Sequence, residues 1–484
     1  MRHSVSTVLL GVLLFQVGAS SGAGAVDDSS VAERMARLEA ETQALRAELE
    51  ELRQHPIRLP EVDPSSGTAM TDATPASWRR RAPAADADYF TWAELEAQMK
   101  KLTFTKGAFR IVPYGYFWAD MLYETDRTTP GAYTVYVPSR ETEGENAFII
   151  DARRSRFGVD IAGPMIPLLD CAKSSAKLEV DFQSHLTNVN ENKATVHLRH
   201  VYWQVQNDWF RMLVGQTWDV MSPLYPSTLN YSIGWDGGNI GYRRAQFRLE
   251  RYFALSDASL LTAQFALAQD IVTDFPADPG IQREPAGWPV LQGRVAYTLG
   301  DRNRGRPITL GVSGHIGETG FDFTQAGPGP NPLPPVDDAR FRTWSFNVDL
   351  NAPITDRLTL KGELFTGENL SPFLGGIGQG VCACTRTPVR STGGWLDIGY
   401  DWTPRLHTHA GYGIDDPVDG DLLFGRTYNH FIFGNISYDV TDKLLTGFEV
   451  SSWRTLYQDN SGQNLGPTEP GEAVVFEWMV RYGF

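Results

Sequence analysis

The chain is poor in cysteine and lacks long apolar runs beyond its first residues. Its only cysteines are Cys171, Cys382 and Cys384, too few for a disulfide framework in 484 residues. No later stretch of about 18 apolar residues occurs, which excludes helical membrane spans. The sequence also lacks a Gly-rich phosphate loop and a nucleophile elbow. We therefore expect no cofactor, no bound metal and no enzymatic activity.

Basic stretches are absent as well, and the net charge is -15. Nothing in the chain offsets the repulsion of a nucleic-acid backbone, so nucleic acid is not an expected partner. Aromatic residues make up 12% of the chain, glycine is abundant, and no long helical pattern follows about residue 105. The composition favours an all-β protein.

The last residues alternate between apolar and polar. One side of the final strand carries Val474, Phe476, Trp478, Val480, Tyr482 and Phe484, and the other carries Glu477, Arg481 and Gly483. A transmembrane β-barrel closes with such a strand, and Trp478, Tyr482 and Phe484 are then expected at the membrane interface. An edge strand of a soluble sandwich is the alternative.

The same period of two runs through residues 107–484. Ala176, Leu178, Val180 and Phe182 alternate with charged or polar neighbours, and short turns alternate with long polar segments such as 219–240, 318–340, 367–392 and 454–471. This layout predicts an antiparallel transmembrane barrel of about sixteen strands.

The segment before the barrel divides into four parts. Residues 1–25 have the pattern of a signal peptide cut before Val26, so the chain is expected to be exported. Residues 26–54 carry a heptad stripe that includes Leu38, Leu45, Leu49 and Leu52. It predicts a trimerisation coiled coil, or alternatively a single helix lying on the barrel. A Pro-rich linker (55–88) and a short amphipathic helix (89–106) follow.

One long segment is a candidate for narrowing the channel. Residues 219–241 contain Tyr225, Tyr231, Trp235 and paired glycines. The segment is expected either to fold inward as a constriction or to cap the barrel surface.

Strand parity points a group of arginines into the lumen. They are Arg154, Arg156, Arg199, Arg211, Arg244, Arg248 and Arg294. Guanidinium groups in a narrow channel attract carboxylates and hold them in a fork. In the alternative, these arginines pair with Glu179, Asp181, Asp160 and Glu250 and only fill the wall.

Two further pairs have less specific patterns. Cys382 and Cys384 fit a disulfide within a Gly-rich loop better than half of a metal site, because no histidine or carboxylate adjoins them. His407 and His409 share one lumen face, where plain polar lining is favoured over metal binding.

Several short motifs together resemble the DcaP-like trimeric porins. They are Arg154-Ser155-Arg156-Phe157-Gly158, Ala176-Lys177-Leu178-Glu179 with Asp181-Phe182, Leu198-Arg199-His200-Val201-Tyr202 and Val214-Gly215-Gln216-Thr217-Trp218. The heptad segment, the linker and the terminal Phe484 match that family too. The resemblance implies a homotrimer of sixteen-stranded barrels, a periplasmic coiled coil, and passive uptake of small organic anions such as dicarboxylates. Long Pro-rich loops and the Cys382/Cys384 pair depart from the family pattern.

The sequence therefore predicts an outer-membrane porin with its N-terminal segment in the periplasm. Its expected partners are outer-membrane lipid and lipopolysaccharide, two further copies of the chain, small anionic solutes, and the assembly machinery that reads the C-terminal strand. One alternative is a structural anchor that tethers the envelope through the coiled coil. Another is an outer-membrane enzyme, although no convincing Ser and His pair supports it.

Overall fold

The computed structural model describes residues 104–142, 144–183, 194–272, 280–300 and 306–484. All described residues belong to one unit of the chain, Ala76–Phe484. The predicted signal peptide, coiled coil with its leucines, linker and most of the short helix lie outside the described residues. Those expectations stay predictions.

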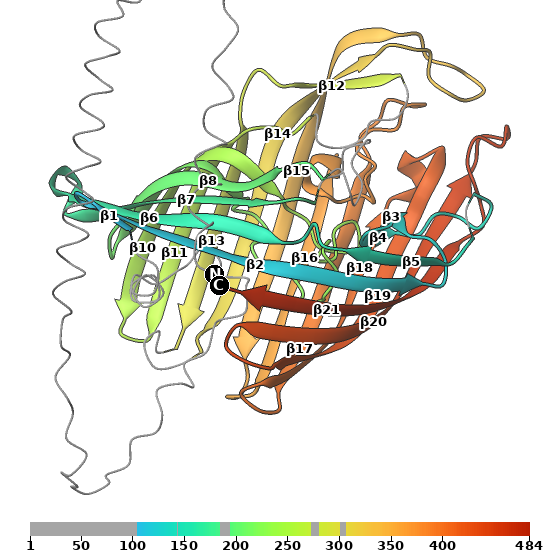
Figure 1. Ribbon diagram of the computed structural model, residues 1–484. Coiled ribbons are helices and arrows are strands. Elements are labelled where there is room, and N and C mark those ends of the chain that lie inside the picture. The colour runs from blue at the N-terminus through green and yellow to red at the C-terminus, as the bar shows by residue number, and fades with distance from the viewer. Residues whose placement is uncertain (1–103, 143, 184–193, 273–279, 301–305) are drawn as a thin grey trace, which may run out of the picture. The chain divides into compact units, whose positions relative to one another are not determined.

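The described residues form a closed antiparallel barrel of 16 strands (Figure 1), as the alternation predicts. The wall starts with β2 (Phe109–Glu124), β5 (Ala147–Asp151), β6 (Arg156–Ile166), β7 (Ala172–Asp181), β8 (His197–Gln206), β9 (Phe210–Trp218), β10 (Arg243–Ser256) and β11 (Ser259–Ala268). It continues with β12 (Ile281–Pro285), β13 (Val290–Leu299), β14 (Ile308–Phe323), β15 (Val336–Pro353), β16 (Leu358–Glu368) and β17 (Arg390–Asp401). It ends with β18 (Leu406–Pro417), β19 (Phe424–Asp439), β20 (Leu444–Asp459) and β21 (Gly471–Gly483).

Two wall positions are occupied by interrupted strands. β5 and β6 both pair with β2, and β12 and β13 both pair with β14, so each couple fills one place in the wall. The barrel closes where β2 meets β21, with Trp118 opposite Arg481. Arg154, which parity placed on a strand, lies in the break between β5 and β6.

Small elements complete the described chain. A short strand, β1 (Phe104–Lys106), pairs with the start of β2, where the sequence predicted the end of a helix. Strands β3 (Thr129–Pro130) and β4 (Thr134–Tyr136) pair with each other, and the 3-10 helices are η3 (Pro167–Leu169), η4 (Ser371–Phe373) and η5 (Asp419–Asp421). Within the described residues, no helix has the length and apolar character needed to span a membrane.

The two ends of the long segment predicted at 318–340 are strand. β14 continues to Phe323 and β15 starts at Val336, and the two pair along this length. They rise with β12 beyond the rest of the rim in Figure 1. Polar and charged residues hid the strand period in this stretch, although Phe321 and Phe323 are buried on one face of β14.

The wall separates an apolar outer face from a more polar inner face. On β16, Leu364 is 65% exposed while Glu363 and Phe365 are each 3% exposed. Trp478 and Tyr482 on β21 and Phe484 just after it are exposed, while Glu477 on β21 is buried. Such a pattern of exposed apolar side chains matches the apolar band of a membrane barrel, whose outer face contacts lipid.

Turns at one end of the barrel repeat the same construction. Thr355 Oγ1 accepts the N–H groups of Arg357 and Leu358 at 3.2 and 3.0 Å. Thr403 and Thr441 accept the equivalent N–H groups in the β17–β18 and β19–β20 turns at the same distances. The threonine hydroxyl satisfies turn amides that the ladder leaves unpaired, so each hairpin is closed by its own sequence. We call this the short-turn end, and the opposite one the long-loop end.

Candidate functional site

The segment between β9 and β10, residues 219–242, folds into the lumen; we call it the inward loop. Its polar groups bond successive strands around the wall, in the order in which they occur along the chain. Val220 N donates to Gln292 on β13, Ser222 N to Ser313 on β14, Leu224 N to Glu363 on β16, Ser227 N to Asp397 on β17 and Leu229 N to Glu449 on β20. The loop therefore crosses the interior, and the surface-cap alternative does not describe its position.

Asp219 fixes the root of the inward loop. Asp219 N donates to Tyr242 O, and Tyr242 N donates to Asp219 Oδ2, both at 2.9 Å. The other carboxylate oxygen lies 2.7 Å from Arg244 Nε and 2.6 Å from Gln292 Nε2. The two ends of the loop are thus tied together at the wall, which forces the intervening residues toward the barrel interior.

The aromatic residues predicted for a constriction occupy different parts of the loop. Trp235 is buried, with its ring centroid 5.2 Å from Tyr242 and 6.2 Å from Tyr231. Tyr231 donates its hydroxyl to Asp181 on β7 at 3.0 Å. Tyr225 stacks against Trp218 with a centroid separation of 6.3 Å. Trp235 and Tyr231 thus belong to the packing that holds the loop, and Tyr225 stacks beside its root.

The paired glycines let the loop backbone approach the wall. Gly238 has a φ of +119°, and a Cβ there would collide with the backbone oxygen of Gly394 on β17. A side chain on Gly413 of β18 would likewise collide with Gly237 O. Glycine is needed on both sides of this contact.

Two further segments reach into the interior, and the sequence analysis missed both. In the β2–β5 connection, Val137 N donates to Thr455 Oγ1 on β20 at 2.9 Å and Thr134 N donates to Asn230 on the inward loop at 3.1 Å. In the β16–β17 connection, Gly378 N donates to Asp236 of the inward loop at 2.9 Å. Apolar residues within nominally polar connections, such as Val135 and Phe373, were the available signal.

Each predicted lumen arginine lies within ion-pair distance of a carboxylate. The pairs are Arg154 with Asp120 and Glu477, Arg156 and Arg199 each with Glu179 and Asp181, Arg211 and Arg248 with Glu250, Arg244 with Asp219, and Arg294 with Asp349. Asp160, which was considered as an arginine partner, lies 3.0 Å from Lys177. The arginines are therefore anchored, and their charges act together with those of their partners.

Charge is unevenly distributed around the inner wall. The segment from β6 to β13 carries the predicted arginines other than Arg154, together with Lys177 and Arg243, beside the buried carboxylates Glu179, Asp181, Asp219 and Glu250. The opposite segment, formed by β15 to β21 with β2, carries buried carboxylates at Asp120, Asp349, Glu363, Asp397, Asp415, Glu449 and Glu477. Cations exceed carboxylates on the first side, whereas buried carboxylates predominate on the other.

Asp236 joins the inward loop to the β16–β17 connection. Its carboxylate Oδ1 accepts the Gly378 N–H, and its backbone oxygen accepts Asn429 Nδ2 of β19 at 2.7 Å. Burial raises the pKa of Asp236 to about 6, although Arg426 and the Gly378 N–H favour its charged form. This carboxyl on the loop therefore changes protonation near neutral pH.

Replacing Asp236 with Asn should stabilise the protein at pH 8 by up to about 3 kcal/mol, because the variant avoids burying a charge. The folded pKa lies above the unfolded value, so wild-type stability from this group is highest at low pH and falls as pH rises toward 6. The difference between variant and wild type should therefore fall to about half at pH 5 and vanish only near pH 3, below the unfolded pKa. Heat-shift electrophoresis at pH 5 and pH 8 measures it, with exposed Asp442→Asn as the control. A difference that is equal at pH 5 and pH 8 would contradict the assignment.

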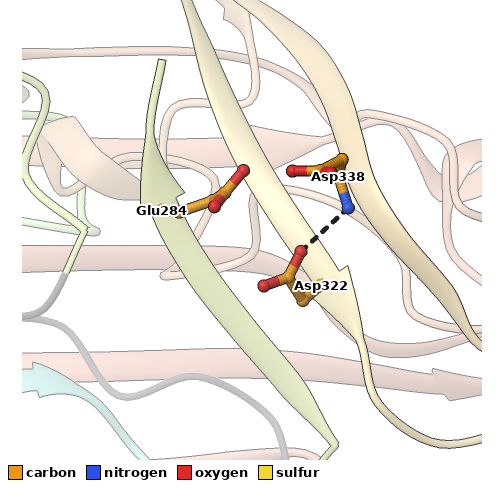
Figure 2. A group of neighbouring side chains, drawn as sticks. All are labelled: Glu284, Asp322 and Asp338. Carbon is orange, nitrogen blue, oxygen red and sulfur yellow. Dashed lines mark hydrogen bonds between the residues drawn. The ribbon is translucent and has the colours of Figure 1, made fainter. Parts of the chain in front are cut away.

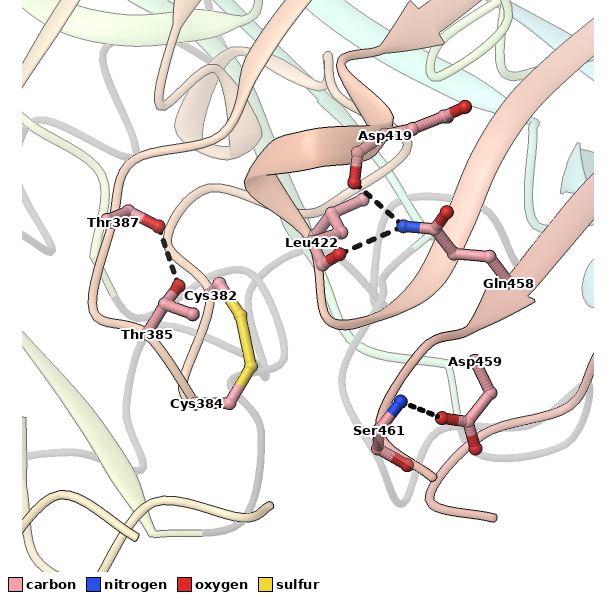
Figure 3. Close-up of a disulfide and its surroundings, with 9 residues drawn as sticks. All are labelled: Cys382, Cys384, Thr385, Thr387, Asp419, Leu422, Gln458, Asp459 and Ser461. Atoms are coloured by element: carbon pink, nitrogen blue, oxygen red, sulfur yellow. Dashed lines mark hydrogen bonds between the residues drawn. A yellow bond between two sulfur atoms is a disulfide. The ribbon is translucent and has the colours of Figure 1, made fainter. Parts of the chain in front are cut away.

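The cysteine pair forms a disulfide in the β16–β17 connection (Figure 3). Cys382 and Cys384 are bonded across a separation of two residues and are both buried. Cys171, just after η3, is free and exposed. Of the two interpretations of this pair, the structure supports the disulfide. While the disulfide is intact, the two sulfur atoms are not available as metal ligands.

Possible metal ligands are already engaged in other bonds. Glu284, Asp322 and Asp338 on β12, β14 and β15 place carboxylate oxygens within 4.8 Å of one another (Figure 2), but Arg340 Nη2 lies 2.7 Å from Glu284. Asp338 N donates to Asp322 at 2.9 Å, the bond drawn in Figure 2. His407 and His409 engage different carboxylates, Asp401 and Asp397. Each of these groups thus has an ion-pair or hydrogen-bond partner within the protein.

Comparison with solved structures identifies the barrel type. The outer-membrane channel DcaP of Acinetobacter baumannii aligns with a TM-score of 0.60 and 16% identity, covering 79% of this chain and 100% of that one. The anion-selective porin of Comamonas acidovorans aligns with a TM-score of 0.50 and 11% identity, covering 78% of this chain and 100% of that one. No family model and no curated protein matches the sequence. The resemblance to DcaP-like porins is thus confirmed for the fold.

Proposed function

We propose that the protein is a passive diffusion channel of the bacterial outer membrane for small hydrophilic solutes. The observation that carries the proposal is the closed barrel with an apolar outer face, a polar inner face and the inward loop bonded across its lumen. A barrel of sixteen strands is wide enough to hold water, and an inward loop narrows it. The solved DcaP and Comamonas structures with this fold are named as a channel and a porin.

Small organic anions, dicarboxylates among them, are the proposed preferred solutes. The arginines between β6 and β13 line one side of the interior beside the root of the inward loop. Acidic residues at the long-loop end, such as Asp419, lie farther out, where salt screens their field over about 8 Å. The charges at the narrow part should then dominate entry.

The remaining parts of the proposal concern assembly. We propose that the N-terminal segment trimerises the chain as a periplasmic coiled coil, through the heptad residues Leu38, Leu45, Leu49 and Leu52. The Pro-rich linker would connect this coiled coil to the barrel. Trp478, Tyr482 and Phe484 are proposed to lie at the lipid interface, and the terminal strand to be read by the assembly machinery. Lipopolysaccharide is the proposed lipid partner at the long-loop end. No catalytic step is part of this function.

Purified protein in planar bilayers should open in triplet steps and prefer chloride over potassium. The basic side of the lumen provides the physical reason. Reversal potential under a salt gradient measures the preference, and addition of succinate should reduce the current. Silent bilayers with correctly folded barrels would favour the structural-anchor alternative, whereas cation preference would show that the carboxylate side governs permeation.

A further inference from the structure

Arg243 differs from the arginines that parity selected. It is the first residue of β10, it is 2% exposed, and its Nε and Nη2 have no hydrogen-bond partner. In the described part of the chain, no carboxylate lies within ion-pair distance of it, whereas its neighbour Arg244 contacts Asp219 at 2.7 Å. A buried guanidinium without an anion is unfavourable, so its retention needs a physical explanation.

Aromatic faces supply part of that explanation. The guanidinium carbon lies 4.6 Å from the Trp218 ring centroid, 4.7 Å from that of Tyr242 and 5.9 Å from that of Trp235. Aromatic faces attract a cation but do not accept the in-plane N–H hydrogens of a guanidinium as an oxygen does. Two donors remain available to an oxygen ligand.

The nearby carboxylates are shared by other cations. Glu179 and Asp181 both contact Arg156 and Arg199, and Asp181 also accepts His197 Nδ1 at 2.9 Å. His197 Nε2 in turn lies 3.1 Å from the hydroxyl of Tyr242, the residue before Arg243. Arg243 therefore adds positive charge beside a cluster whose anions are already engaged.

The position of Arg243 is at the root of the inward loop. It pairs across the ladder with Trp218, and the two residues flank the loop whose ends Asp219 and Tyr242 hold together. Trp218 also lines a small pocket with Tyr225, Asn239 and Gly241. The half-buried Trp218 ring thus contacts Arg243 and also borders this pocket.

We propose that Arg243 is the anion-binding residue of the channel: a carboxylate of a permeating solute displaces the edge of the Trp218 ring and accepts the Nε and Nη2 hydrogens in a fork. The proposal rests on the channel function above and assigns its selectivity to one residue. Arginine suits this role because its planar donors match both carboxylate oxygens. The aromatic faces hold the guanidinium in place between solutes.

Current block by succinate in planar bilayers tests the assignment. Arg243→Met keeps the apolar stem and removes the charge and the donors, so the half-blocking succinate concentration should rise about tenfold, the effect of losing charge-assisted hydrogen bonds. The chloride preference should fall as well. Arg140→Met removes the same charge from an exposed pair with Glu472 and should leave both values unchanged.

Arg243→Lys provides the second arm if the Met variant does not fold. Lysine keeps the charge but not the fork, so succinate block should weaken while the reversal potential stays at its wild-type value. Unchanged block in either folded variant would overturn the assignment and make Arg243 a packing residue. Silent wild-type bilayers would instead refute the channel function itself.

Discussion

Replacing residues 223–240 of the inward loop with a short Gly-Ser linker is expected to raise single-channel conductance at least about twofold, because a sixteen-stranded wall without an inserted loop leaves a wide aqueous channel. The loop is bonded to strands on opposite sides of the wall, from Gln292 to Glu449, and so occupies the cross-section. Glu363 and Asp397 would lose amide donors but gain water, so the barrel should remain folded. Conductance of the folded variant in planar bilayers measures the effect.

A deletion in another loop tests whether the effect is specific to the inward loop. Residues 462–465 at the long-loop end are exposed, and their removal should leave conductance unchanged. If both deletions gave the wild-type conductance, the narrowest part of the channel would lie in the β2–β5 or β16–β17 connection instead.

Reversing one buried charge, Arg199→Glu, should abolish the folded barrel. Arg199 Nε lies 2.8 Å from Glu179 and its Nη1 lies 2.7 Å from Asp181, and all three side chains are buried. Removing one partner of such a cluster costs about 3–5 kcal/mol, and a third carboxylate in its place costs more. Heat-shift electrophoresis should show no folded band.

The control reverses an exposed charge. Arg342 is 60% exposed and lies 3.4 Å from Glu368, so Arg342→Glu should change stability by less than about 1 kcal/mol. A folded Arg199→Glu barrel of wild-type stability would show that water reaches Glu179 and Asp181 freely. Selectivity is therefore better probed by neutral substitutions than by reversing arginines of this cluster.

The sequence was sufficient to predict the barrel wall. Strict alternation of side chains, as at Glu363, Leu364 and Phe365, arises because the two faces of the wall lie in different environments. The pattern can be recognised within the sequence of each single strand. The strand period was harder to recognise where polar and charged residues are frequent, as at the ends of β14 and β15 beyond the rim. The two interrupted wall positions, β5 with β6 and β12 with β13, could not be predicted either. The residues in each break do not alternate between apolar and polar, so the sequence does not show that the two strands share one position.

The interior was less predictable, since it depends on contacts between distant residues. The inward loop was anticipated from its length, glycines and aromatics, but its partners Glu363, Asp397 and Glu449 lie far along the chain. The alternation of side chains along β10 predicted that Arg244 faces the lumen but gave no role to Arg243. The Arg243 side chain packs against Trp218 and Tyr242 at the start of the strand. Pairing of the arginines could be named as an alternative, but the choice of carboxylates required the three-dimensional register.

Chain closure imposes an order on folding. Most neighbouring strands are also consecutive in sequence, and turns such as those at Thr355, Thr403 and Thr441 let hairpins close through local bonds. The pairing of β2 with β21 alone joins the two ends of the barrel, as between Trp118 and Arg481. Contacts of such long sequence separation form slowly. Until β21 pairs with β2, one edge of β2 has no partner, and an unpaired strand edge promotes aggregation. Pairing of β21 removes this exposed edge.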